Sequence, residues 1–323
     1  MALLEVENLQ VSFNTPDGVV RAVRGVSFSV ERGRTLGIVG ESGSGKSVAT
    51  QTIVGLTRGA RVSGRAALDG VELLGASPEA LRRIRGAQIG MIFQDPLSSL
   101  HPYYKVGWQI VEMIREHERG TSKAAARERA IELLDAVGIP GPRTRIDSYP
   151  HEFSGGMRQR VMIAMAMALR PAVLVADEPT TALDVTVQAQ VLDVMRAVQQ
   201  EFGTAIVLIT HDLGVVADMA DDVVVMYGGQ VMERAPRREL FYRRHHPYTE
   251  GLLRSLPTAG RRGRLTPIGG TPPSLITPPP GCPFAPRCPS AFDACAETPP
   301  FREIGPGHDS ACWLPAEPLK KAL

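Results

Sequence analysis

Hydrophobic and polar residues alternate along two segments near the N-terminus, residues 3–13 and 23–30, which are also rich in β-branched residues. Alternation turns one face of a strand toward the core and the other toward solvent, so both segments are predicted to be antiparallel strands. Three shorter runs, residues 35–39, 172–176 and 205–210, are almost entirely apolar. The first precedes a glycine-rich turn, and the other two are typical of parallel strands that helices cover on both faces. The pattern predicts an α/β core.

A helical segment is expected in the middle of the chain. Residues 106–137 combine the helix formers Ala, Glu, Arg and Leu with apolar residues at helical spacing, and glycine and proline follow them,. From about Pro257 the composition changes, because Pro and Gly become frequent and neither sustains a helix or a central strand,. A loop-rich C-terminal extension is therefore expected to begin there.

Composition and charge narrow the class of protein. The 323 residues are 43% hydrophobic and 22% charged, as in an ordinary globular chain,. Thirty-six Lys and Arg stand against 34 Asp and Glu, which gives a net charge of +2, too small and evenly spread for a nucleic-acid-binding surface,. No signal peptide and no apolar run of about 18 residues is present, so the chain is expected to stay in the cytosol.

The strongest motif is GESGSGKS at residues 40–47, which fits G-x-x-x-x-G-K-[ST] and lies between the strand at 35–39 and a helical run,. Glycines let consecutive N–H groups point at phosphate oxygens, and the helix N-terminus adds its positive dipole end. Lys46 is predicted to pair with the β- and γ-phosphates, and the Ser47 hydroxyl to bind Mg²⁺. A chance glycine-rich turn would lack this context. The predicted ATP-binding residues here are Gly40, Ser42, Gly43, Ser44, Gly45, Lys46 and Ser47.

Two carboxylates follow the strand at 172–176, where ligands of parallel sheets bind,. Asp177 is predicted to hold Mg²⁺ through water, and Glu178 to polarise the water that attacks the γ-phosphate. His211 follows the strand at 205–210, from which a neutral imidazole can hydrogen-bond the γ-phosphate and the attacking water. The alternatives are an exposed acidic turn and a structural histidine.

The segment FSGGMRQR at residues 153–160 precedes the strand that ends in the two carboxylates. Together with the phosphate-binding loop, it resembles the ATP-binding cassette family, whose signature is usually written LSGGQ. The resemblance implies that Ser154, Gly155 and Gly156 open a helix and grip the γ-phosphate of ATP bound to an opposite subunit. Phe and Met stand where the commonest signature has Leu and Gln.

The same resemblance assigns three further residues. Gln94 is implied to touch Mg²⁺ and to report to membrane subunits, and Asp184 ends the Thr-Ala-Leu-Asp turn that crosses the dimer. Phe13 matches the aromatic residue that stacks on adenine, although a core phenylalanine on a strand is the alternative. The other two residues have plain turns as alternatives.

A fold and a domain division also follow from the resemblance. It implies an α/β fold with a RecA-like P-loop ATPase core, an antiparallel β subdomain and a helical signature subdomain at about residues 95–165. We expect the nucleotide-binding domain to span residues 1–235. The C-terminal extension is expected over residues 236–323.

Four strings narrow the resemblance to the ATPases of oligopeptide and dipeptide importers, whose relatives also move nickel. They are QDPLSSLHP at 94–102, YPHEFSGGMRQR at 149–160, HPYTEGLLRSLP at 246–257 and PPGCPFAPRC at 279–288. His101 stands where this branch commonly has Asn.

The branch implies an ATP-hydrolysing subunit that works with a second, distinct ABC ATPase, two transmembrane permeases and an extracytoplasmic solute-binding protein. Its place would be the cytoplasmic face of the inner membrane, as a peripheral protein. The alternatives are an importer of nickel or another small solute, a soluble ABC ATPase acting on ribosomes or DNA, and an iron–sulfur regulatory protein in which ATP is secondary.

The four cysteines, Cys282, Cys288, Cys295 and Cys312, cluster near the C-terminus. Four thiolates in a cytosolic chain suit zinc or an iron–sulfur cluster, and their spacing does not decide between the two. The resemblance implies a [4Fe–4S] cluster on all four, with unligated thiols as a further alternative. Because the phosphate-binding loop and the cysteines lie far apart in the sequence, we expect loss of the cluster to leave ATP binding intact.

Overall fold

The computed structural model describes residues 2–95, 99–181, 183–255 and 267–316. The chain divides into two compact units. One, here called the helical unit, contains Val30–Arg34 and Ala76–Leu208. The other, here called the phosphate-loop unit, contains Ala2–Ser29, Thr35–Gly75 and the chain from Ile209 onward. Pro257, the predicted start of the extension, lies outside the described residues.

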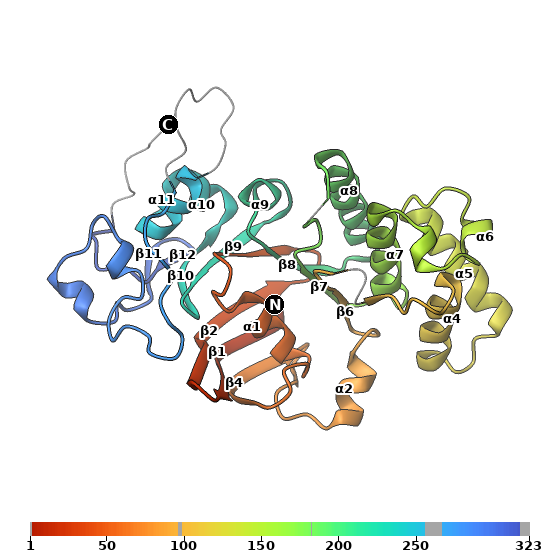
Figure 1. Cartoon of the computed structure of the whole chain (residues 1–323), viewed down its shortest axis with the longest axis horizontal. Coiled ribbons are helices and arrows are strands. Elements are labelled where there is room, and N and C mark those ends of the chain that lie inside the picture. The colour runs from red at the N-terminus through yellow and green to blue at the C-terminus, as the bar shows by residue number, and fades with distance from the viewer. Residues whose placement is uncertain (1, 96–98, 182, 256–266, 317–323) are drawn as a thin grey trace. The chain divides into compact units, whose positions relative to one another are not determined.

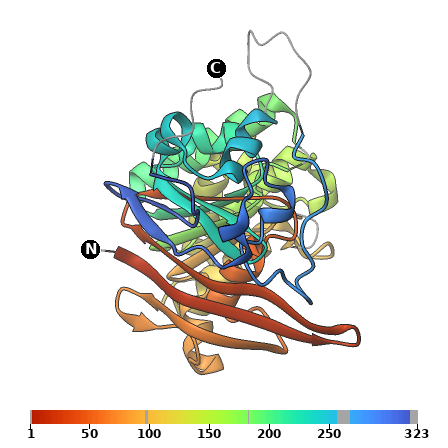
Figure 2. The ribbon, with the colours of Figure 1, turned by 90° about the vertical axis from the view of Figure 1, so that its left-hand side faces the viewer.

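The N-terminal sheet of the phosphate-loop unit is antiparallel, as the alternation of residues predicts. Its strand order is β2-β1-β4-β5, and β1 pairs antiparallel with β4 so that Val6 lies opposite Ala66. Figure 2 shows the two long N-terminal strands running together. The bounds are β1 Ala2–Thr15, β2 Gly18–Glu31, β4 Ala60–Leu68 and β5 Val71–Glu72.

A second group of strands in this unit carries the phosphate-binding loop. Strand β3 is fully buried and pairs in parallel with β9, and the order continues from β9 through β10 and β12 to β11. The bounds of the strands are β3 Thr35–Val39, β9 Asp222–Tyr227, β10 Gln230–Pro236, β11 Arg302–Gly305 and β12 His308–Ser310. The helices are α1 Lys46–Ile53, α9 Leu213–Met219, α10 Arg237–Arg243 and α11 Pro247–Arg254, with 3-10 turns η2 Ala285–Arg287 and η3 Asp293–Ala296.

The C-terminal extension is more ordered than its composition predicts. Strand β12 pairs antiparallel with β10, so that Ser310 lies opposite Glu233. Two short strands in a Pro- and Gly-rich segment give little periodicity to detect, and they form because β10 offers them a paired edge. The loop-rich extension therefore also contains a short antiparallel pair of strands, β11 and β12.

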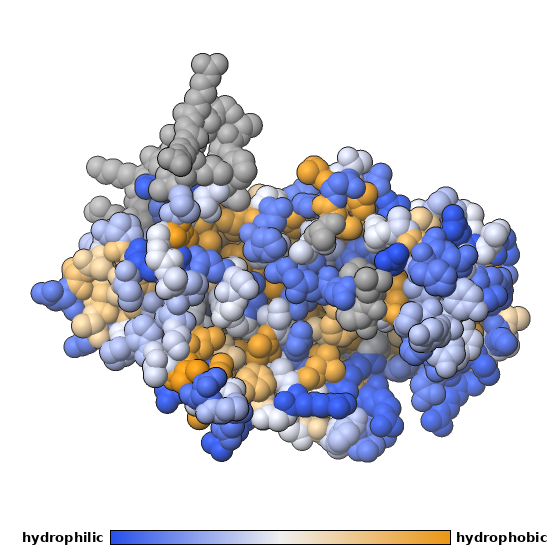
Figure 3. All heavy atoms as spheres, in the orientation of Figure 1, coloured by the Kyte–Doolittle hydropathy of each residue, from blue (hydrophilic) through white to orange (hydrophobic). Residues whose placement is uncertain are grey.

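The helical unit holds the parallel strands β7 and β6, the first four residues of β8, which is the other neighbour of β7, and most of the helices. The predicted helical segment at 106–137 forms α4 and α5, which pack with α7 (Figure 1). On the face of the helical unit seen in Figure 3, the surface over α4 to α6 is largely polar. The bounds are β6 Ile89–Ile92, β7 Val173–Asp177, β8 Ala205–Thr210, α2 Pro78–Ile84, α4 Val106–His117, α5 Lys123–Ala136, α6 Pro142–Arg145, η1 Pro150–Glu152, α7 Gly155–Met167 and α8 Val185–Phe202.

An aromatic core joins the extension to the sheet within the phosphate-loop unit. The Tyr227 ring of β9 lies 4.6 Å from the Tyr248 ring of α11 and 5.4 Å from the Phe284 ring, measured between centroids. All three side chains are at most 1% exposed. Such tilted and edge-on aromatic pairs add stability beyond the area that they bury. No helix within the described ranges is long and apolar enough to cross a membrane.

Candidate functional site

The phosphate-binding loop connects the buried strand β3 to helix α1. Helix α1 begins at Lys46, and its N-cap residue Gly45 lies in the left-handed region without a side-chain cap. The first N–H groups of a helix have no partner inside the helix, so an uncapped end can bind an anion. The loop therefore offers backbone donors where the sequence predicts phosphate.

Two glycines of this loop have no room for a side chain. A Cβ on Gly40 would lie 2.1 Å from the Met226 carbonyl oxygen, and one on Gly45 would lie 2.3 Å from the Ala22 carbonyl oxygen. Both also have positive φ, 152° and 96°, which residues with a Cβ rarely adopt,. Sterics inside the chain thus fix the backbone path of the loop.

The Lys46 ammonium lies inside the loop. Its Nζ donates hydrogen bonds to the carbonyl oxygens of Gly40 over 2.8 Å and Glu41 over 2.9 Å, and to the Ser44 hydroxyl over 3.3 Å. The residue is only 5% exposed. These hydrogen bonds hold the ammonium inside the loop, where an anionic ligand would meet it.

In the helical unit, the predicted carboxylates lie at the end of β7. Asp177 is its last residue and is buried, and Glu178 follows in the left-handed region with φ 48°. The Glu178 carboxylate accepts hydrogen bonds over 2.9 Å from the Gln94 side-chain amide and from the Thr181 hydroxyl. The structure thus brings Gln94 and Glu178 together from segments 84 residues apart.

The predicted signature residues begin helix α7. Ser154 is the N-cap, and its Oγ accepts a hydrogen bond from the Met157 N–H over 3.3 Å. Ser154 and Gly155 are exposed, whereas Phe153 is buried. A Cβ on Gly156 would lie 2.5 Å from Cγ1 of Val187, but one on Gly155 would meet nothing within 4 Å. The chain's own packing thus requires glycine at 156 but not at 155.

The other predicted residues are distributed over both units. Asp184 caps α8 by accepting a hydrogen bond from the Val187 N–H over 3.0 Å, and its neighbour Ala182 lies outside the described residues. In the phosphate-loop unit, His211 is exposed after β8, and Phe13 is half-buried on β1 opposite Ala60. The half-buried position of Phe13 fits both an adenine platform and a core residue.

The four cysteines line one small cavity. Together with Phe284, Phe292 and other residues, all four surround it, and none forms a disulfide. Burial raises the pKa of the Cys282 and Cys288 thiols and raises that of Cys312 to about 11, and neighbouring thiols act in the same direction. Within the described part of the chain, no three His, Cys, Asp or Glu side chains converge to hold a single metal ion.

The cysteine segment also contacts the phosphate-binding loop, so the distance between the two in the sequence does not separate them in the fold. Arg287, directly before Cys288, forms a bidentate ion pair with Glu41, the second residue of the loop, 246 residues away. Sequence reasoning missed both residues, because position 41 is variable in the phosphate-loop pattern. In PPGCPFAPRC, only the cysteines have side chains typical of a metal or cluster site, so Arg287 carried no signal of its own.

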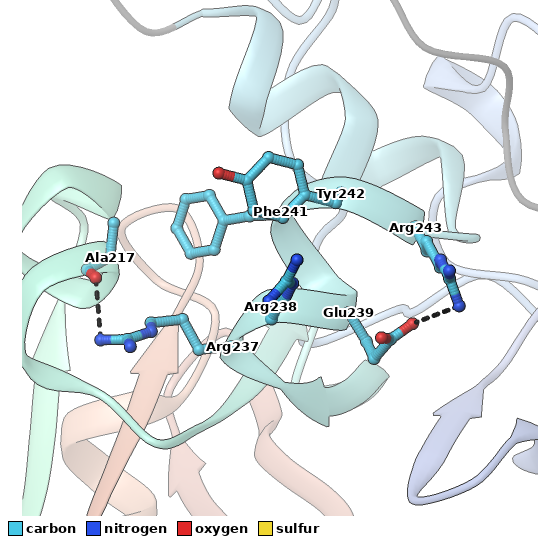
Figure 4. Close-up of a pocket in the computed structure, with 7 residues that line it drawn as sticks. All are labelled: Ala217, Arg237, Arg238, Glu239, Phe241, Tyr242 and Arg243. Atoms are coloured by element: carbon cyan, nitrogen blue, oxygen red, sulfur yellow. Dashed lines mark hydrogen bonds and ion pairs between the residues drawn. The ribbon is translucent and has the colours of Figure 1, made fainter.

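A broad hollow of about 800 Å³ lies elsewhere in the phosphate-loop unit. Figure 4 shows its lining from α10 and the end of α9, where Arg237 and Arg238 lie near Phe241 and Tyr242. Arg237 donates to the Ala217 carbonyl oxygen over 3.0 Å. None of the lining residues belongs to the predicted ATP-binding set.

Two family models match the chain. Residues 23–181 match the model described as ABC transporter. Residues 232–295 match the model described as oligopeptide/dipeptide transporter, C-terminal region. The first match contains the phosphate-binding loop, the signature segment and the Asp-Glu pair. The second contains α10, α11 and three of the four cysteines.

Curated relatives match over nearly the whole chain. The oligopeptide transport ATP-binding protein OppD of Salmonella typhimurium (strain LT2) is 52% identical over 320 residues, which cover 98% of this chain and 95% of the relative. The dipeptide transport ATP-binding protein DppD of Bacillus subtilis (strain 168) is 50% identical over 326 residues, which cover 99% and 97%.

Two solved structures share the fold. The ATP-binding cassette MJ0796, in a dimeric post-hydrolysis state bound to ADP and Pi, has a TM-score of 0.66 and 26% identity. That match covers 73% of this chain and 99% of MJ0796. The cbiO1 protein of Clostridium perfringens, part of the transporter complex cbiONQ, has a TM-score of 0.63 and 29% identity, over 74% and 90% of the two chains. The RecA-like α/β fold predicted from the sequence is confirmed.

Proposed function

Because the chain belongs to the ABC transporter family, in the branch of oligopeptide and dipeptide transport ATP-binding proteins, we propose that it powers the uptake of peptides through two permease subunits. The chain is an ATPase, and its hydrolysis of ATP to ADP and phosphate is coupled to transport. The observation that carries the peptide assignment is that about half of the residues are identical to those of the peptide-transport relatives, over nearly the full length of the chain and including the extension.

ATP binding is assigned to the phosphate-binding loop. The uncapped N-terminus of α1 and the buried ammonium of Lys46 supply the donors that the β- and γ-phosphates need,. Phe13 is proposed to stack on adenine. Ser47, Gln94 and Asp177 are proposed to hold Mg²⁺, since hydroxyl, amide and carboxylate oxygens are ligands that it prefers. The bound ion would neutralise charge on the phosphates.

Hydrolysis is assigned to Glu178, with His211 as a further hydrogen-bonding group. The Gln94 amide and the Thr181 hydroxyl donate to the Glu178 carboxylate, and these two hydrogen bonds fix its orientation. An ionised, oriented carboxylate can polarise the attacking water as a general base. His211 at the end of β8 is proposed to hydrogen-bond the γ-phosphate.

A second ATPase subunit completes the site in this proposal. Ser154 and Gly155 are exposed, so they are available to the γ-phosphate of ATP bound to a partner. The partner is proposed to be a distinct paralogue, with Asp184 in the turn that crosses the dimer. This predicts ATP hydrolysis that is weak in the chain alone and depends on its concentration. Hydrolysis by a monomer at a rate independent of concentration would contradict it.

The permease contact is proposed at an exposed aromatic group after Gln94. Tyr103 is 82% exposed, and the Tyr104 and Trp108 rings stack with centroids 4.2 Å apart while both remain more than 40% exposed. His101 packs against Tyr104 at 4.6 Å. Exposed aromatic clusters are typical of protein interfaces. We therefore place the chain at the cytoplasmic face of the inner membrane as a peripheral subunit, with an extracytoplasmic solute-binding protein supplying the peptide.

The domain division keeps its predicted bounds as part of this proposal. Residues 1–235 form the nucleotide-binding domain, and the helical subdomain covers about residues 95–165. Residues 236–323 form the extension. The two family models match residues 23–181 and 232–295, and this supports a domain boundary close to residue 235.

We further propose that Cys282, Cys288, Cys295 and Cys312 hold a [4Fe–4S] cluster. What supports the proposal is that all four cysteines line one small cavity, since four Cys thiolates are the usual ligands of such a cluster,. Burial raises the pKa of Cys282, Cys288 and Cys312, so a bound positive centre would be needed to stabilise their thiolate forms,. The cluster would join segments of an extension that has little apolar core of its own.

The proposed function is tested by reconstitution in proteoliposomes. The chain is combined with the second ATPase and the two permeases proposed as its partners, and the solute-binding protein is added outside. We expect peptides loaded on the binding protein to stimulate ATP hydrolysis and to accumulate in the vesicles. Nickel is the matched control solute. Stimulation by nickel but not by di- or oligopeptides would replace the peptide assignment with the alternative one.

A further inference from the structure

We propose that Arg287 is a positioning residue for the phosphate-binding loop, and that through it the cysteine segment sets the affinity of this subunit for ATP. The inference rests on the proposed role of the loop in binding ATP. It concerns two residues outside the predicted ATP-binding set, Arg287 and Glu41. Both lie in the phosphate-loop unit.

Arg287 and Glu41 form a bidentate ion pair. Nη1 of Arg287 lies 2.7 Å from Oε2 of Glu41, and Nη2 lies 3.1 Å from Oε1. The Arg287 side chain is 6% exposed and that of Glu41 is 24% exposed. A paired, mostly buried guanidinium–carboxylate contact fixes both position and orientation, unlike a pair at the surface.

All five N–H donors of Arg287 are used. Besides the two bonds to Glu41, Nη1 donates to the Tyr227 hydroxyl over 3.0 Å, Nε to the Gly269 carbonyl over 2.7 Å and Nη2 to the Ile268 carbonyl over 3.2 Å. Burial opposes the charge, but the hydrogen bonds to Glu41 and Tyr227 raise the pKa of Arg287 above its ordinary value. A lysine cannot reproduce this planar set of contacts.

Glu41 is held at its main chain as well as its side chain. Its N–H donates to the buried Tyr248 hydroxyl over 2.9 Å, and its carbonyl accepts from Lys46 Nζ over 2.9 Å. The residue that Arg287 grips is therefore also the residue that helps to hold the phosphate-binding lysine. A shift of Glu41 would move the Lys46 ammonium and the loop amides together.

Charge gives a second reason for the pairing. Glu41 carries a negative charge on a loop proposed to bind the triphosphate of ATP, and like charges at short range repel. The Arg287 guanidinium offsets the negative charge of the Glu41 carboxylate and binds both of its oxygens. Without Arg287, geometry and charge would both weaken ATP binding.

The turn that carries Arg287 is framed by two of the proposed cluster ligands. In η2, the Ala285 N–H donates to the Cys282 carbonyl over 3.0 Å, and the Cys288 N–H donates to the Ala285 carbonyl over 3.2 Å. Arg287 itself donates its N–H to the Phe284 carbonyl over 2.9 Å. A change at Cys282 or Cys288 is thus transmitted to Arg287 through this short turn.

The test is a double-mutant cycle on the full chain. Equilibrium binding of a fluorescent ATP analogue is measured for wild type, R287Q, E41Q and the double variant. We expect R287Q to weaken binding about tenfold in the wild-type background and less than about twofold in the E41Q background, because Arg287 then has no carboxylate to position. R287K keeps the charge without the fork, and we expect a loss of about threefold.

A kinetic split distinguishes positioning from loss of folding. In the assembled transporter, R287Q should raise the KM for ATP with little change in kcat. The matched control is R234Q, because Arg234 pairs with Asp309 between β10 and β12 of the same unit, over 2.7 Å, without touching the loop. We expect R234Q to lower the melting temperature while leaving ATP affinity at the wild-type value. Melting temperature and iron content are recorded for every variant.

The link to the cysteines is tested by C288S. We expect it to weaken ATP binding in the wild-type background and to have no further effect in the R287Q background. The role of Arg287 would be overturned if R287Q bound ATP as tightly as wild type. It would also be overturned if R287Q weakened ATP binding as much in the E41Q background as in the wild-type background. Unchanged affinity in C288S would overturn the link to the cysteine segment. A wild-type chain that binds no ATP would instead contradict the proposed function.

Discussion

The side-chain amide of Gln94 donates a hydrogen bond to Glu178 over 2.9 Å, and the Thr181 hydroxyl donates a second to the same carboxylate oxygen. Glu178 adopts φ 48°, a conformation that costs energy for a residue with a Cβ,. Backbone strain of this kind persists only where surrounding contacts hold it. The carboxylate thus has a fixed direction, and Gln94 is the residue that would sense a change in it.

Removing that carboxylate should separate ATP binding from ATP hydrolysis. For E178Q we expect the turnover of ATP to fall by at least about a hundredfold, because the general base is lost, while the phosphate-binding loop is untouched. Steady-state phosphate release and equilibrium ATP binding measure the two quantities. Trapped ATP should also stabilise the closed dimer. The control is E201Q, an exposed glutamate of α8; near-normal turnover in E178Q would rule out its role.

Lys46 should act mainly on binding. K46A removes a buried ammonium group, which carries a positive charge and donates hydrogen bonds, from a site for anions. We therefore expect ATP affinity to fall by about tenfold or more. The Kd for ATP is the quantity to measure. The exposed Lys123 at the start of α5 provides the control, since K123A removes the same charge from the chain as a whole. Unchanged affinity in K46A would count against the assignment.

The two signature glycines should respond differently to alanine. In G156A the new Cβ meets Val187 Cγ1, a stiff β-branched neighbour, so we expect a loss of about 1–3 kcal/mol in stability,. In G155A the new Cβ meets nothing within 4 Å, and position 155 is the first residue of α7, so we expect little change in stability. If Gly155 faces ATP of a partner subunit, G155A keeps its melting temperature but loses ATPase activity in the assembled transporter. Full activity in G155A would show that this glycine does not approach ATP.

Protein purified without oxygen should be brown. We expect broad absorption at about 400 nm and about four irons per chain, because four thiols line one cavity,. C288S should lose most of the iron and loosen the segment from residue 267 onward, as measured by limited proteolysis. Stoichiometric zinc without iron, or a colourless protein after reconstitution, would refute the cluster. The assignment of the chain as an ATPase would still stand.

Much of the fold was readable because it is encoded locally. The buried run at 205–210 became β8 with the predicted bounds, and the segment at 106–137 became α4 and α5. The phosphate-binding loop is likewise local: its glycines, lysine and serine occupy eight consecutive residues between a strand and a helix. Periodicity and turn chemistry act between neighbours in the chain, so the sequence alone determined these features.

Pairings between distant segments were decided only by the tertiary structure. The bonds of Glu178 to Gln94 and of Arg287 to Glu41 join residues 84 and 246 positions apart, and β12 forms because β10 offers it an edge. Such contacts depend on how the whole core packs, which no local pattern specifies. The sequence thus determined that this chain binds ATP and carries four clustered thiols. Packing of Phe284 and Tyr248 against Tyr227 decided that the thiol segment reaches the phosphate-binding loop.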